Sequence, residues 1–217
     1  MAKESREISN VKRVVLHGYG ELFIKQGDAE TLIVETDNEY LDHVKTKVDD
    51  GTLYIDVLGA WGKRISTFFS RGYKSQRIKY NLTVKVLDGL SISGAARVRV
   101  SVLKTEALSI RLGGAADIAV DSLEADRLDV RMPGAGSIKI KGKITSQDIH
   151  VGGAGSYMAG ELESQDAKVR ITGVGKAVVR VSENLDISLT GLGSVDYYGK
   201  PRVTQSVSGF GQVTSRG

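Results

Sequence analysis

The stretch that decides the fold is residues 110–140, IRLGGAADIAVDSLEADRLDVRMPGAGSIKI. Apolar and polar residues alternate on both sides of a glycine corner. Ile110 and Leu112 precede the corner at Gly114, and Ile118 follows it. A period of two residues is typical of β-strands that bury one face. The same pattern returns 20 residues later, so the unit is a repeat.

The repeat continues through the second half of the chain. From residue 90 onward, the first glycine of each unit follows the previous one by 18–20 residues. A unit this short holds two or three strands and cannot bury its apolar face alone. We therefore expect an all-β fold in which about seven coils stack as a parallel β-helix, or solenoid. The structural corners are Gly94, Gly114, Gly134, Gly153, Gly173, Gly191 and Gly209.

The register of the repeats predicts which side chains stack inside the solenoid. Each coil supplies one apolar residue before the corner and one after it. The alternative is an antiparallel β meander with Gly-x-Gly turns, although two-residue hairpins favour Asn-Gly or Asp-Gly. The two predicted inward columns are Leu112, Met132, Val151, Ile171 and Leu189, and Ile118, Ile138, Tyr157, Ala177 and Val195.

Residues 1–89 form a different segment. They carry one corner, at Gly18 and Gly20, but no 20-residue rhythm follows it. Strand-like runs and an Asp-Gly turn signal after residue 49 predict a mainly antiparallel β segment. We expect this segment to cap the solenoid of residues 90–217, so that the two parts form one continuous unit.

A basic, aromatic insertion spans residues 58–79. It holds six Lys or Arg and no acid, whereas the whole chain has a net charge of +4. Such a segment suits packing against the solenoid or a subunit contact, and next an anionic membrane or glycan surface. Nucleic acid is the least favoured partner. The candidate interaction surface is Trp61, Lys63, Arg64, Phe68, Phe69, Arg71, Tyr73, Lys74 and Arg77.

Composition and motifs exclude several functions. The chain has no Cys, which excludes disulfides and thiol chemistry, and its three His residues have no Ser or Asp at a diagnostic spacing. No Gly-x-Gly continues into a phosphate-binding motif. Asp117 is the only carboxylate directly after a Gly-x-Gly corner in the repeat, too few for calcium. We therefore expect no enzymatic activity, no metal and no cofactor.

The sequence leaves the compartment open. No apolar run is long enough for a membrane span, and the first residues, MAKESRE, do not resemble a signal peptide.

A polar column is expected on the outer side of the strands that precede the corners. Two residues earlier in the same strands, Asp129 and Asp148 can screen its positive charges. Like charges at strand spacing are unfavourable alone. The column is therefore either a solvated, salt-bridged face or a groove for an anionic glycan. Its members are Arg111, Arg131, His150 and Arg170.

These features resemble a bacterial family, the “putative auto-transporter adhesin, head GIN domain”. The resemblance rests on the Gly-x-Gly repeat, the opening segment 14–28, the hairpin at 50–55 and the ending at 198–201. It covers nearly the whole chain apart from residues 58–77. It implies a non-catalytic interaction or structural module of the cell envelope, or a secreted one. The alternative function is a carbohydrate-binding or polysaccharide-active β-helix.

Self-association is expected from the last coil. Its corner holds Phe210, where earlier coils have Ala. We expect no cap after this coil, so its free backbone N–H and C=O groups and its core edge would be exposed. This predicts a homo-oligomer, most simply a two-fold dimer, with the Phe210 end or the 61–73 loop at the contact.

Overall fold

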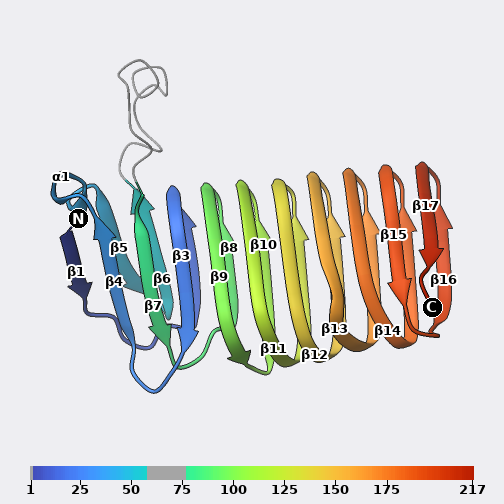
Figure 1. The fold of residues 1–217 in the computed structure, drawn as a ribbon, viewed down its shortest axis with the longest axis horizontal. Coiled ribbons are helices and arrows are strands. Elements are labelled where there is room, and N and C mark those ends of the chain that lie inside the picture. Colours follow the sequence, from blue (N-terminus) through green and yellow to red (C-terminus); the bar gives the residue numbers. More distant parts are fainter. Residues whose placement is uncertain (1, 58–76) are drawn as a thin grey trace, which may run out of the picture.

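A computed structural model describes residues 2–57 and 77–217. They form a long rod, a β-solenoid of about six turns whose strands cross the rod axis (Figure 1). The strands of the repeat pair in parallel, which confirms the predicted solenoid and excludes the antiparallel meander. The two ends of the chain lie at opposite ends of the rod.

The rod has two faces, and four long strands run through both of them. These strands are β11 (Ala115–Met132), β12 (Ala135–Val151), β13 (Ala154–Ile171) and β14 (Val174–Leu189). The first face adds β1 (Ala2–Arg6), β4 (Thr31–Thr36), β7 (Lys79–Val84), β3 (Tyr19–Gln26), β9 (Ala95–Lys104), β15 (Leu192–Tyr198) and β17 (Phe210–Ser215). The second face adds β5 (Val44–Asp49), β6 (Thr52–Val57), β2 (Arg13–His17), β8 (Gly89–Ile92), β10 (Ala107–Leu112) and β16 (Arg202–Val207).

The faces meet at two edges, a corner edge with the Gly-x-Gly corners and a wide edge with longer turns. Glycine is required at the corner edge because successive coils approach closely there. A Cβ added at Gly114 would overlap the carbonyl oxygen of Gly94, and one at Gly134 would overlap that of Gly114. Neither glycine has a left-handed backbone, so close approach explains these corners.

The interior consists of stacked apolar columns, as predicted. Ile138 pairs with Ile118 on one side and Tyr157 on the other, and all three are at most 1% exposed. The column that contains Met132 and Val151 is buried in the same way. Burying a side chain of this size contributes about 1.5–3 kcal/mol. One hydrophobic core runs from Val11 to Val195.

A chain of hydrogen bonds crosses this core near the wide edge. The Tyr157 hydroxyl donates to Gln147 Oε1 at 2.8 Å, and Gln147 Nε2 donates to Ser164 Oγ at 2.8 Å. Ser164 Oγ donates in turn to the carbonyl of Arg180 at 2.9 Å. Burial raises the pKa of Tyr157, so its hydroxyl remains a donor. The polar groups are thus partnered, as buried polar atoms must be.

The N-terminal segment contains a coil of its own, and the strand order is not the chain order. β2 and β3 pair in parallel with β8 and β9, and on their other side with β6 and β7. The chain therefore begins at the outer end of the rod with β1 and enters the stack at β2 and β3. It then runs outward through β4, α1 (Asn38–Leu41) and β5, and returns through β6 and β7. The antiparallel pairs are β1–β4, β4–β7 and β5–β6.

Arg6 ties the two faces together at this end. Its guanidinium donates to the carbonyl of Val44 at 2.7 Å and to Thr46 Oγ1 at 3.0 Å, which joins β1 to β5. These outermost strands also carry charged side chains such as Lys3 and Lys47. Charged edge strands resist pairing with other chains.

Candidate interaction surface

The polar column lies on the second face. Parallel register places Arg111 beside Arg131, Arg131 beside His150, and His150 beside Arg170. The column continues with Ser188. The alternation of the strands turns these side chains outward while their neighbours enter the core.

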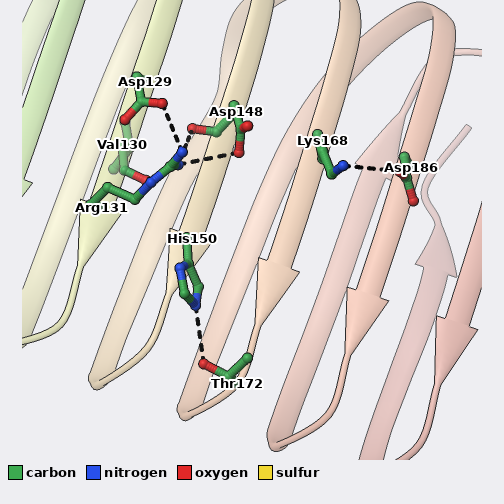
Figure 2. A network of polar contacts seen from close by, with 8 residues as sticks. All are labelled: Asp129, Val130, Arg131, Asp148, His150, Lys168, Thr172 and Asp186. Carbon is green, nitrogen blue, oxygen red and sulfur yellow. Dashed lines mark hydrogen bonds and ion pairs between the residues drawn. The ribbon is translucent and has the colours of Figure 1, made fainter.

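Arg131 is held by two carboxylates, as Figure 2 shows. Its Nη2 lies 2.9 Å from Asp129 Oδ2, and its Nη1 lies 3.2 Å from Asp148 Oδ1. Nη1 also donates to the carbonyl oxygens of Val130 at 3.3 Å and Asp148 at 3.2 Å. The guanidinium is half-buried, and its charge is offset by the two acids.

His150 lies between two guanidinium-bearing neighbours. Burial, then Arg170 and Arg131, lower its pKa, and Asp148 opposes them. Its Nε2 is 3.1 Å from Thr172 Oγ1 (Figure 2). The imidazole is therefore neutral at pH 7, because the pKa lies below the usual value of about 6.5.

The two remaining arginines of the column have free charges within the described part of the chain. Neither Arg111 nor Arg170 makes an ion pair or a side-chain hydrogen bond to another residue in 2–57 or 77–217. By contrast, Lys168, in the adjacent column, reaches Asp186 at 3.8 Å (Figure 2). Among the described residues, the second face thus has paired charges around Arg131 and one guanidinium without an acidic partner on either side of them.

The basic, aromatic insertion lies outside the described residues except for its last part. Of the candidate surface, only Arg77 is described, and it is exposed just before β7. In the chain order the insertion joins β6 to β7. Val57 and Ile78, which flank it, lie against the neighbouring corner at Gly18 and Gly20.

A second polar feature follows the wide edge. Here opposite charges alternate from coil to coil in a charge ladder, each member in register with the next. Lys104 Nζ contacts Glu124 Oε1 at 2.7 Å, and this bond raises the pKa of Lys104. The ladder borders a groove of about 950 Å³ along the rod axis. The members of the charge ladder are Lys104, Glu124, Lys143, Glu163 and Arg180.

His17 has a carboxylate partner that the sequence did not reveal. Its Nδ1 lies 2.9 Å from Asp56 Oδ1, on the adjacent strand of the second face. The two residues are 39 positions apart, and only the N-terminal strand order brings them together. Asp117, in contrast, lies beside Arg97 and accepts a hydrogen bond from Ser137 at 2.6 Å.

The described residues contain no cluster of three or more His, Asp or Glu side chains that could hold a metal ion. Nor does this part of the chain include a helix long and apolar enough to cross a membrane.

These features define a class of protein, the β-solenoid repeat proteins that present extended polar faces. The chain belongs to the family described as “putative auto-transporter adhesin, head GIN domain”, whose model matches residues 10–201. The resemblance recognised from the repeat is thereby confirmed. No curated protein matches the sequence.

Three solved structures share the fold. A putative adhesin from Bacteroides fragilis NCTC 9343 superposes with a TM-score of 0.90 at 23% identity, covering 99% of this chain and 96% of the other. A putative adhesin from Parabacteroides merdae gives 0.70 at 20% identity. A putative lipid binding protein from Parabacteroides distasonis gives 0.72 at 21% identity. The last two each cover 100% of this chain and 96% of their own. The structural similarity establishes a shared fold, and at this level of sequence identity it says nothing about ligands.

Proposed function

We propose that this chain is a non-catalytic interaction module of the bacterial cell envelope, and that its second face binds an anionic glycan. The adhesin family supports a surface role. The observation that carries the ligand class is the polar column, in which Arg111 and Arg170 have no acidic partner among the described residues. They lie three strands apart, or about 14 Å at normal strand spacing, which suits a linear polyanion along the rod.

The carboxylates of this face favour binding over cleavage. Hydrolysis of a glycan needs a free acid or base beside the scissile bond. The column beside the polar column contains Asp129 and Asp148, which both contact Arg131, and Asp186, which contacts Lys168. Each of these acids is paired with a cation and is not a free acid or base, which argues against the polysaccharide-active alternative.

Calorimetry with oligogalacturonate, an acidic glycan, and dextran oligosaccharides, a neutral one, tests this function. Binding is expected for the acidic glycan alone, and added salt should weaken it. The double variant Arg111→Ser/Arg170→Ser should bind at least tenfold more weakly. Arg97→Ser, on the first face, is the matched control and should bind normally. Equal binding by the double variant would contradict the proposal. New reducing ends in the mixture would support the enzymatic alternative instead.

We also propose that the chain self-associates, as the sequence predicted. The exposed Phe210 supports this, since its side chain is 86% exposed. Sedimentation equilibrium up to several hundred micromolar protein tests it, and a purely monomeric protein would contradict it.

A further inference from the structure

A row of large apolar side chains lies exposed on the corner edge near the C-terminal end of the rod. Val174, Leu192 and Phe210 occupy the middle position of three successive corners and pair in register. They are 57%, 49% and 86% exposed. We call these three residues the corner row. They point away from the core, so packing among the described residues does not account for them.

From β9 onward, the residue at this corner position becomes larger toward the C-terminal end, whereas the N-terminal coil carries Tyr19 at the same position. The same corner position is Ala in β9, β11, β12 and β13, and then becomes Val, Leu and Phe. The exposed fractions correspond to roughly 300 Å² of apolar surface, within the size range of the largest patch on a typical monomer, which often has a function.

The flanks of the corner row are polar but nearly uncharged. Thr172, Thr190 and Ser208 line one side, and Lys176, Ser194 and Gln212 line the other. The single charge, on Lys176, is already matched by Asp196 at 3.1 Å. An apolar centre with aromatic character and few charges is typical of a protein–protein interface core.

We propose that the corner row is the contact between two copies of this chain, related by a two-fold axis that passes beside Leu192. This inference rests on the proposed self-association and specifies where it occurs. The axis makes the two rods antiparallel, with only their C-terminal coils overlapping. Leu192 then meets its own counterpart, and Phe210 meets Val174 of the second copy.

The gradient of side-chain size selects this antiparallel arrangement. At both ends of the corner row, Phe210 of one copy faces Val174 of the other, so the two ends pack equally closely. A parallel arrangement would pair Phe210 with Phe210 and Val174 with Val174, which leaves a gap at one end. The antiparallel axis also pairs Thr190 with its counterpart and places Lys176 opposite Gln212 of the second copy. No like charges meet, which is the self-complementarity that an isologous interface requires.

The contact is small beside the roughly 800 Å² per partner of a standard interface, so the association is weak and needs high concentration. Sedimentation equilibrium should detect it in the wild type at several hundred micromolar. Leu192→Arg brings two cations together at the axis and should weaken the dimer at least tenfold. Ala135→Arg places the same charge at the equivalent corner of an earlier coil and is the matched control. Leu192→Ser, which adds no charge, should also weaken the dimer, and circular dichroism checks that each variant folds.

Cross-linking tests the geometry directly, because the chain has no native Cys. Leu192→Cys should form a disulfide-linked dimer on mild oxidation, and Ala135→Cys should not. Val174→Cys and Phe210→Cys proteins of different mass can be mixed and oxidised. The disulfide-linked dimer of one with the other should then be more than twice as abundant as either disulfide-linked homodimer.

A monomeric wild type without cross-linking at Leu192→Cys would refute both self-association and this interface. A dimer that Leu192→Arg leaves intact would refute the interface alone and place the contact elsewhere. A dimer that cross-links Phe210→Cys to itself would refute the antiparallel arrangement.

Discussion

The buried hydrogen-bond chain makes a sharp prediction for the variant Tyr157→Phe. The Tyr157 side chain is fully buried, and its hydroxyl is the donor to Gln147 Oε1 at 2.8 Å. Removing the hydroxyl leaves that oxygen without its donor inside the core. An unsatisfied buried acceptor costs about 1–3 kcal/mol. For a chain of 217 residues, this corresponds to a melting temperature lower by roughly 2–12 °C.

Urea denaturation followed by circular dichroism measures this effect as a lower midpoint with an unchanged slope. Tyr198→Phe is the matched control. The Tyr198 ring is half-buried, and its hydroxyl has no hydrogen bond within the described residues. The variant keeps the stacking contact with Arg180, whose Cζ lies 5.0 Å from the ring centroid. Its stability should therefore stay within about 0.5 kcal/mol of wild type. The double variant Gln147→Leu/Tyr157→Phe should be little worse than Tyr157→Phe, because the unsatisfied oxygen is gone. A stability for Tyr157→Phe equal to that of the control would refute the reasoning.

Three other measurements address the core, the charges and the metal content. Ile138→Asp buries a charge between two coils and should prevent folding, so a wild-type circular dichroism spectrum and midpoint would show that the register is wrong. Burial opposes ionisation of Asp196, but hydrogen bonds from Lys176 and Arg216 outweigh it and lower its pKa. Because the folded pKa lies below the unfolded value of about 3.9, this stabilisation is present above that pH and is lost as pH falls through the folded pKa. Asp196→Asn should therefore flatten the acid limb of a plot of urea midpoint against pH, and an unchanged limb would contradict this. A chelator should leave the melting temperature unchanged, and a fall of several degrees would reveal a structural metal.

The sequence predicted the core of the repeat because two signals agreed there. Alternation fixed which side chains face inward, and the glycine corners fixed how one coil aligns with the next. The pairings of Ile138 with Ile118 and with Tyr157 follow from these two signals alone. The polar column follows from the same register, because its residues lie between inward-facing neighbours.

The wide edge could not be predicted in the same way. Its turns differ in length, and the register shifts between Ala159 and Glu163 relative to the next coil. A repeat alignment anchored on the glycines therefore fails at this edge. The charge ladder of Lys104, Glu124 and their successors, with its groove, was missed for this reason.

The N-terminal coil was hidden by its order in the chain. β2 lies between β6 and β8, and β3 lies between β7 and β9. All four of these neighbours come later in the sequence. Contacts such as His17 with Asp56 depend on this order, and no local pattern encodes it. Periodicity identified the strands but not their neighbours.

The stacking of the rod also has a mechanical consequence. The two termini lie at opposite ends of the rod (Figure 1). Strands of successive coils pair along the rod, so the hydrogen bonds between coils run along the line that joins the termini. Tension between the ends therefore acts on every ladder alike, and the weakest ladder separates first, since each coil contacts only its neighbours. Coils are expected to peel off singly, and each releases 18–20 residues, or about 60 Å of extended chain. A rod of this kind, held at both ends and pulled, would unfold in steps and lengthen before either end came loose.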